Sequence, residues 1–136
     1  MSVAKVLKMI KDKEVKFVDL RFTDTKGKWQ HTAQTASTIN ENTFKEGIMF
    51  DGSSIAGWKN INESDMILMP DPDTAVIDPF TAQPQMILFC DVISPSDWKP
   101  YDLDNSSSCK KAEDYLKSYV IGEKCFFGPE AEFFVF

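Results

Sequence analysis

A short turn near the middle of the chain gathers the side chains best suited to chemistry. Residues 50–58 read FDGSSIAGW, so the carboxylate of Asp51 and two serine hydroxyls, one of them on Ser54, share one turn between apolar residues. A carboxylate can attract a cation and accept a proton. Gly52 and Gly57 allow the backbone to bend sharply or to approach a ligand closely. The same residue types are also ordinary hairpin-turn chemistry, so the turn alone leaves both interpretations open.

A second set of acidic residues follows late in the sequence. Residues 125–136 read CFFGPEAEFFVF, an apolar segment that predicts a strand. Glu130 and Glu132 lie two residues apart, which would place both carboxylates on one face of that strand. Carboxylate oxygens suit a hard divalent cation, although two such residues also fit the solvated face of an edge strand. The sequence therefore offers a candidate pair of metal ligands.

Hydrophobic periodicity predicts the elements that would hold these residues. Helices are expected at residues 2–10, at 41–46 between Asn40 and Gly47, and from Cys109 to Val120. Residues 94–108, rich in proline and serine, are interpreted as a linker. Apolar runs predict strands at residues 15–22, 29–33, 66–69, 75–77 and 86–93. The pattern indicates a small α+β domain followed by a linker, a helix and a strand.

The composition narrows the class of protein. A net charge of −6 argues against a surface for nucleic acid or anionic membrane, and no apolar run approaches membrane-spanning length. A hydrophobic content of 43% with eleven phenylalanines indicates a folded globular chain. Three cysteines without a metal-binding spacing favour reduced thiols in a cytoplasmic protein, with Cys90 and Cys125 buried and inert. His31 has no second ligand nearby, so we expect it at a surface or hydrogen-bonded position.

An ordered series of motifs resembles the amino-terminal region of bacterial type I glutamine synthetase. The turn at 50–58 is followed by NESDM at 62–66, LMPD at 68–71 and TAVIDPF at 74–80. GPEAEFF at 128–134 resembles the first metal-ligand strand of the same family. The resemblance covers essentially the whole chain and implies the family's fold.

The resemblance implies a domain organisation. Residues 1–98 would form a β-grasp domain, residues 99–104 a linker, and residues 105–136 the truncated start of the family's catalytic α/β domain, one helix and one strand. Because the strand expected at 125–136 is apolar and would have no partner after it, we expect the chain to be truncated or a fragment.

The resemblance also implies a reaction, the ATP-dependent ligation of ammonia to the γ-carboxyl group of glutamate. Asp51 would bind and deprotonate ammonium, Ser54 would lie near the site of phosphate transfer, and Glu130 and Glu132 would bind Mg²⁺ or Mn²⁺. In the family's dodecamer of two stacked rings, the turn at 50–58 reaches into the active site of the neighbouring subunit. Asp51 and the two glutamates of one chain would then serve different active sites.

Two departures from the family pattern affect these expectations. The family usually carries Arg before the Cys-Asp pair of the long apolar strand, where this chain has Phe89. The family usually shows Tyr-x-Arg-Asp-Pro-Arg in the linker, where residues 101–106 read YDLDNS and Leu103, Asn105 and Ser106 differ. An alternative interpretation is a free-standing β-grasp interaction module, or a degenerate fragment, that assembles with a full-length synthetase.

Overall fold

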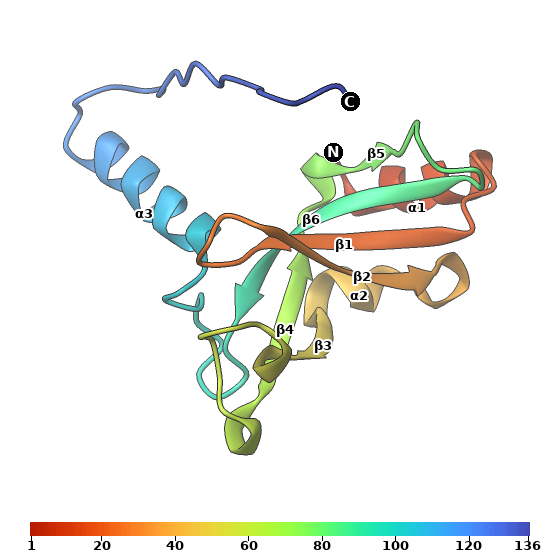
Figure 1. Cartoon of the computed structure of the whole chain (residues 1–136), viewed down its shortest axis with the longest axis horizontal. Helices are drawn as coiled ribbons and strands as arrows, with labels where there is room; N and C mark the ends of the chain where they lie inside the picture. The colour runs from red at the N-terminus through yellow and green to blue at the C-terminus, as the bar shows by residue number, and fades with distance from the viewer.

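The computed structural model describes residues 1–136, and a curved sheet of six strands forms its centre (Figure 1). Five strands follow the order β2-β1-β6-β4-β3, and the short β5 pairs with β6 outside that row. β1 and β6 run parallel, whereas the other neighbouring pairs are antiparallel. The strands are β1 (Phe17–Thr23), β2 (Trp29–Thr35), β3 (Ile48–Asp51), β4 (Asp65–Pro70), β5 (Val76–Ile77) and β6 (Gln85–Ile93).

Three α-helices and four 3₁₀ turns complete the chain. The first two helices begin at side-chain caps, because Ser2 and Asn40 accept hydrogen bonds from backbone N–H groups of the first turn. The helices are α1 (Val3–Asp12), α2 (Glu41–Glu46) and α3 (Asn105–Ser118), and the 3₁₀ turns are η1 (Ala36–Thr38), η2 (Gly52–Ser54), η3 (Ile61–Glu63) and η4 (Pro72–Thr74).

The apolar core lies between one face of the sheet and helices α1 and α2. Alternate residues of β1 and β6 point into it, and Leu20 and Leu88 are fully buried there. α1 contributes Val6 and Ile10, one turn apart on its buried face. This curled sheet with helices on one face confirms the expected α+β class and the β-grasp-like fold.

The elements expected before residue 94 are confirmed, with ends that differ by at most two residues. The helix at 41–46 has the expected bounds, and Gly47 closes it with a φ of 71°. Among the α-helices and strands before residue 94, β3 alone was not predicted. It has four residues and pairs with β4 alone at the edge of the sheet, so it carries too short an apolar pattern to recognise.

The long β6 holds the sheet together. Its first five residues pair with β1, and residues 90–93 pair with β4, so β6 joins the β1–β2 hairpin to the β3–β4 hairpin. β5 pairs with Met86 and Ile87 of the same strand. This central position explains the nearly continuous apolar run that identified the strand in the sequence.

The linker expected at 94–108 ends earlier than predicted. α3 begins at Asn105, because the fully buried carboxylate of Asp104 accepts hydrogen bonds from the backbone N–H groups of Ser106 and Ser107. The serine run is therefore the first turn of a helix rather than linker. No helix of the structure combines the length and the apolar character needed to span a membrane.

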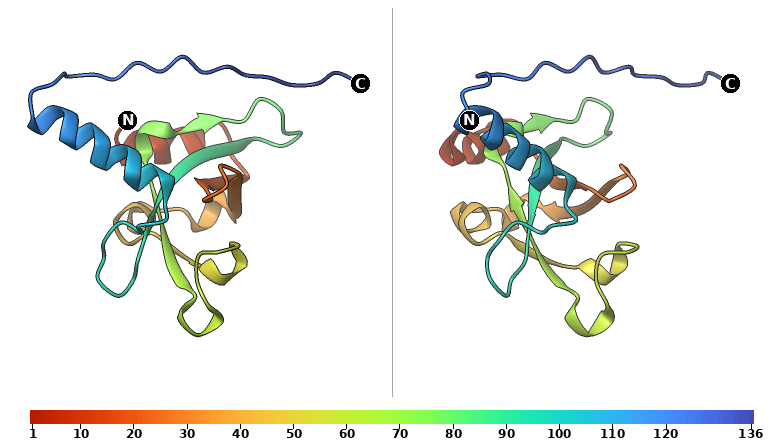
Figure 2. Two further views of the ribbon diagram at one scale, coloured as in Figure 1. Left: turned by 60° about the vertical axis from the view of Figure 1, so that its left-hand side comes forward. Right: turned by 90° about the vertical axis from the view of Figure 1, so that its left-hand side faces the viewer.

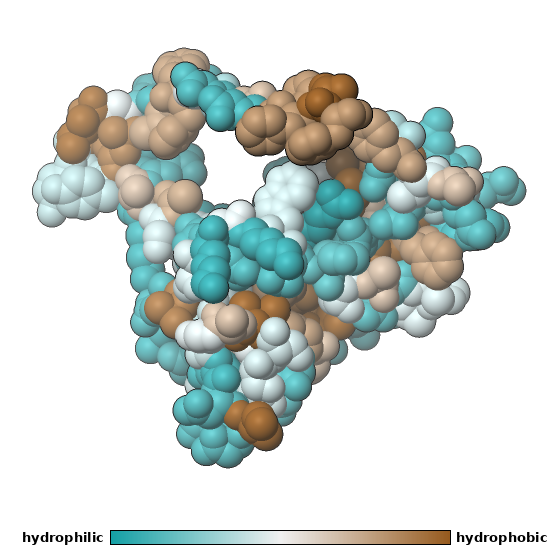
Figure 3. Space-filling view, in the orientation of Figure 1, coloured by the Kyte–Doolittle hydropathy of each residue, from teal (hydrophilic) through white to brown (hydrophobic).

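The strand expected at residues 125–136 is absent, and this prediction was wrong. The chain from 119 to 136 contains no helix or strand (Figure 2), and its phenylalanines are exposed. In Figure 3, hydrophobic patches interrupted by a hydrophilic one cross the top of the molecule. A strand needs a neighbour for its backbone N–H and C=O groups, and no edge of the sheet pairs with this segment. Cys125 is exposed for the same reason, contrary to the buried position expected for it.

Candidate functional site

Asp51 is the last residue of β3, at the point where the chain leaves the sheet. It lies opposite Asp65 of β4, and the backbone N–H of Gly52 donates to the carbonyl oxygen of Ser64 at 2.7 Å. The pairing with β4 therefore continues for one residue beyond the strand. This fixes the backbone on the N-terminal side of the Asp51 turn, by which we mean residues 51–58.

The carboxylate of Asp51 is exposed and held by its own turn. Its Oδ1 accepts from the backbone N–H of Ser53 at 2.8 Å and from Oγ of the same residue at 2.6 Å. These bonds, the hydroxyl first and the backbone second, lower the pKa of Asp51, and Ser64 acts in the same direction. The carboxylate therefore remains charged in more acidic solution. A lower pKa favours attraction of a cation and weakens the carboxylate as a base.

The two glycines of the Asp51 turn serve different purposes. Gly57 has a φ of 83°, which confirms the expected sharp bend. Gly52 has no positive φ, but a Cβ at this position would lie 2.6 Å from Cγ of Met66 and 3.0 Å from the Ser64 carbonyl oxygen. Gly52 is thus required for close approach of the turn to β4, whereas the sequence suggested a sharp bend or close approach to a ligand.

The C-terminal side of the Asp51 turn is fixed by the core. Ile55 is 7% exposed and Trp58 is 5% exposed, and both belong to the apolar cluster beneath the sheet. The Trp58 ring packs against Phe22, Phe50 and Tyr101, with ring centroids 5.5, 6.4 and 5.3 Å away. The turn is therefore bound to the domain at both of its ends.

Ser54 lies in η2, three residues after Asp51, and is exposed. Its hydroxyl makes no hydrogen bond within the chain, in contrast to that of Ser53. The side chain is thus free to meet a ligand beside the carboxylate. The expectation that it lies near a phosphate-transfer site stays a prediction.

Glu130 and Glu132 lie far from the Asp51 turn. In Figure 1 and both views of Figure 2, the yellow loop after β3 lies in the lower half of the molecule, and the blue segment after α3 crosses its top. Both glutamates are exposed and form no hydrogen bond or ion pair. The chain holds no group of three or more residues suited to bind a metal ion. Their oxygens fit a hard divalent cation in type but supply only part of a coordination shell.

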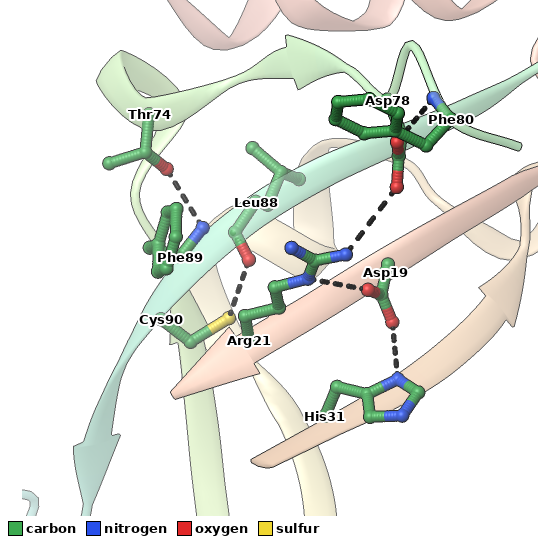
Figure 4. A network of polar contacts seen from close by, with 9 residues as sticks. All are labelled: Asp19, Arg21, His31, Thr74, Asp78, Phe80, Leu88, Phe89 and Cys90. Atoms are coloured by element: carbon green, nitrogen blue, oxygen red, sulfur yellow. Dashed lines mark hydrogen bonds and ion pairs between the residues drawn. The ribbon is translucent and has the colours of Figure 1, made fainter. Parts of the chain in front are cut away.

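His31 and Cys90 behave as the sequence led us to expect. Nδ1 of His31 lies 2.7 Å from Oδ1 of the buried Asp19, which also accepts from Nε of Arg21 at 2.7 Å (Figure 4). Nη2 of Arg21 lies 3.5 Å from Oδ2 of Asp78, so Arg21 joins two carboxylates and the network is structural. Burial raises the pKa of the Cys90 thiol far above its usual range and makes it unreactive.

Two of the residues that depart from the family pattern, Phe89 and Asn105, make contacts of their own. Phe89 packs edge-on against Trp29, with ring centroids 5.2 Å apart. Nδ2 of Asn105 donates to the carbonyl oxygen of Asp24 in the β1–β2 turn at 2.7 Å. Leu103 is exposed. Phe89 and Asn105 thus both contact the β1–β2 hairpin.

Tyr101 and Ser64 contribute to the site but were not singled out from the sequence. Ser64 lies in a short stretch recognised only as part of a motif, and Tyr101 lies in a stretch interpreted as linker. The one available signal was an aromatic residue within that linker, since a large apolar ring there needs a surface to cover. The residue on the domain that Tyr101 would cover was not evident from the sequence.

Comparison with known proteins places most of the chain in one family. A family model described as the β-grasp domain of glutamine synthetase matches residues 14–95. This range begins just before β1 and ends after β6, so it includes the whole sheet and the Asp51 turn.

Individual relatives match nearly the whole of this chain but only part of their own length. Glutamine synthetase of Bradyrhizobium diazoefficiens is 61% identical over 137 residues, which cover 100% of this chain and 29% of the relative. A Cupriavidus pinatubonensis protein named 3-hydroxylaminophenol mutase is 58% identical over 99% of this chain and 29% of its own length. A cryo-electron-microscopy structure of Plasmodium falciparum glutamine synthetase shares the fold, with a TM-score of 0.77 and 22% identity over 88% of this chain and 23% of that one. The chain thus spans less than a third of the length of these relatives.

Proposed function

The chain belongs to the glutamine synthetase family through its β-grasp domain, and on this basis we propose that it supplies the ammonium-binding part of an ATP-dependent ligase. In the proposed reaction the γ-carboxylate of glutamate receives a phosphoryl group from ATP, and ammonia then displaces phosphate to give glutamine. The observation that carries the proposal is the Asp51 carboxylate. It is exposed and kept charged by Ser53, and its turn is bonded to β4 on one side and packed into the core on the other.

Asp51 acts in this proposal first by its charge. An ionised carboxylate attracts ammonium, and a turn that is already ordered does not have to be ordered on binding. Deprotonation then requires the proton of ammonium to pass to Oδ1 or Oδ2. The hydrogen bonds from Ser53 make the carboxylate a weak base, so binding of ammonium is better supported than its deprotonation. Ser54, exposed beside it, would face the phosphate that leaves.

The divalent cation that the proposed reaction requires is assigned to Glu130 and Glu132. Glu130 and Glu132 would hold Mg²⁺ or Mn²⁺ together with ligands from elsewhere, since the chain contains no third candidate beside them. A divalent cation bound there would neutralise the phosphate charge and orient the transferred group.

Asp51 and the glutamates are proposed to serve different active sites of a homo-oligomer. The loop after β3 and the segment after α3 lie on opposite sides of the sheet, which supports this division because one chain does not bring them together (Figure 1). Each complete site would then combine the Asp51 turn of one subunit with Glu130 and Glu132 of a neighbour, as the family's dodecamer implies.

The test uses a chimera in which residues 1–136 replace the matching region of the Bradyrhizobium relative. Asp51→Asn keeps the shape and removes the charge, so we expect the ammonium-dependent rate to fall by about 10²-fold or more while ATP binding survives. Asp114→Asn in the same chimera is the control, because it makes the same change at an exposed carboxylate that the proposal gives no role. An unaltered dependence on ammonium in the Asp51→Asn chimera would contradict the proposal.

Mixed oligomers test the division between subunits. Asp51→Asn subunits mixed with Glu130→Gln subunits should regain part of the activity, because some interfaces then combine two intact halves. Each variant assembled alone is the control. If hybrids shown to be mixed recover nothing, the Asp51 turn and the glutamates do not act across a subunit boundary.

A further inference from the structure

Tyr101 hydrogen-bonds the C-terminal end of the Asp51 turn, in addition to the core packing of Ile55 and Trp58. The phenol hydroxyl donates to the backbone carbonyl oxygen of Trp58 at 2.6 Å, across 43 residues of sequence. The two rings meet edge to face, with centroids 5.3 Å apart. Burial raises the pKa of Tyr101, so the hydroxyl remains a donor.

Tyr101 is itself fixed by the sheet and by α3. Its backbone N–H donates to the carbonyl oxygen of Val92 at 2.8 Å, and Pro100 bridges to Ile93 at the end of β6. Its carbonyl oxygen accepts from the backbone N–H of Asp104, the residue that caps α3. The backbone of Tyr101 is therefore hydrogen-bonded both to β6 and to the residue that caps α3, and this fixes the side chain against Trp58.

The Asp51 turn has few hydrogen bonds of its own. Ile55 N–H donates to the Gly52 carbonyl oxygen and Trp58 N–H to the Ile55 carbonyl oxygen, each at 3.1 Å. No strand pairs with residues 52–58. The carbonyl oxygen of Trp58 is thus the point where the turn is bonded to the chain beyond β6.

We infer that Tyr101 is a positioning residue for Asp51, and that it couples the Asp51 turn to the segment leading into α3. The inference rests on the function proposed above for Asp51. A displacement of α3 or of residues 99–104 would reach Asp51 through Trp58. The sequence-based interpretation of residues 99–104 as a linker does not include this role.

The hydroxyl can be separated from the packing of the ring. Tyr101→Phe keeps the edge-to-face contact and removes only the bond to Trp58. Tyr119→Phe is the matched control, because Tyr119 is 65% exposed and its hydroxyl bonds to nothing in the chain. Tyr101→Leu additionally removes the ring.

The first experiment measures hydrogen exchange in the 136-residue chain. We expect Tyr101→Phe to speed exchange of the Ile55 and Trp58 amides about fivefold, the ratio expected for the loss of one neutral hydrogen bond. Amides of β1 and β6 should be unchanged, as should all amides in Tyr119→Phe. Equal protection of Ile55 and Trp58 in the Tyr101→Phe chain and the original chain would overturn the inference. If Tyr101→Leu fails to fold, the Phe variant still decides the result.

The second experiment measures kinetics in the chimera with the Bradyrhizobium relative. Tyr101→Phe should raise the KM for ammonium about fivefold and leave the KM for ATP unchanged, a split that a general loss of stability would not produce. A normal KM for ammonium in Tyr101→Phe, with a large defect in Asp51→Asn, overturns the positioning role alone. If Asp51→Asn also has no effect on ammonium dependence, the function proposed for Asp51 fails, and the exchange measurement still tests the contact.

Discussion

The Asp51 turn and the segment that bears Glu130 and Glu132 both present carboxylates beside glycine and aromatic residues, yet the chain treats them differently. The turn is bonded to β4 at its start and to Tyr101 at its end. The segment from 119 to 136 has no regular structure, and its phenylalanines are almost fully exposed. Similar residue types are thus ordered in one region and not in the other.

The difference shows that a carboxylate is held in position when the apolar side chains next to it in sequence are buried. Trp58 orders the Asp51 turn because a pocket of aromatic rings from β1, β3 and the stretch after β6 receives it. Phe133 and Phe134 have apolar surface of the same kind but no surface of this chain against which to bury it. Glu130 and Glu132 therefore depend on contacts beyond those that the chain makes, whereas Asp51 does not.

The two regions should differ most in stability when one aromatic side chain is removed from each. Trp58→Ala should lower the free energy of unfolding by about 3 kcal/mol, because it leaves a cavity among packed rings. Phe134→Ala, at a side chain that is 86% exposed, should change it by less than about 0.5 kcal/mol. Denaturant unfolding followed by circular dichroism measures both. Equal effects would mean that the two regions are packed alike.

Adding a methyl group to one glycine in each region should give a smaller difference in stability. Gly52→Ala should cost about 1–3 kcal/mol, since its Cβ would lie 2.6 Å from Met66 and 3.0 Å from the Ser64 carbonyl oxygen. Gly128→Ala is the control, because no atom lies within 4 Å of the added Cβ. Thermal unfolding of the two variants decides the point. A stable Gly52→Ala chain with an unshifted turn would contradict the close approach described here.

The sequence predicted the sheet and its helices well because their signals are local. The alternation in β1, the continuous apolar run in β6 and the cap at Asn40 each follow from residues a few positions apart. The same local signals predicted a strand at 125–136, where they failed. A strand also requires a partner, and the apolar pattern of one segment does not show whether an edge is available to it.

The sequence predicted which residues make up the candidate site, but not the contacts that hold them in place. Asp51, Ser54 and the glycines stood out by residue type, and the resemblance to a known family gave them roles. The contact between Tyr101 and Trp58 joins residues 43 positions apart, and periodicity carries no information about such pairs. The serine run before Cys109 was misread as linker because its capping residue, Asp104, precedes it without an apolar pattern.

The smallest effect concerns the charge of Asp51 itself. Because its pKa is lowered in the folded chain, the charged carboxylate adds stability above the ordinary value of 3.8, and this contribution is lost as the pH falls through the lower folded value. Ser53→Ala removes the hydroxyl bond and should raise the pKa of Asp51 toward 3.8, with the backbone bond retained. Carboxyl ¹³C NMR during an acid titration measures it. Ser54→Ala should leave the pKa unchanged, and an equal rise in both variants would refute the assigned cause.

Hydrogen exchange across the whole chain tests most directly whether the Asp51 turn is positioned from within while the second acidic region is not. Amides of Gly52, Ile55 and Trp58 donate to backbone carbonyl oxygens, whereas those from Phe126 to Phe136 have no acceptor. We predict protection of the first set and exchange at the rate of an unstructured peptide for the second, in the same sample. Protection of residues 126–136 equal to that of the turn, or a turn that exchanges as fast as those residues, would contradict the account.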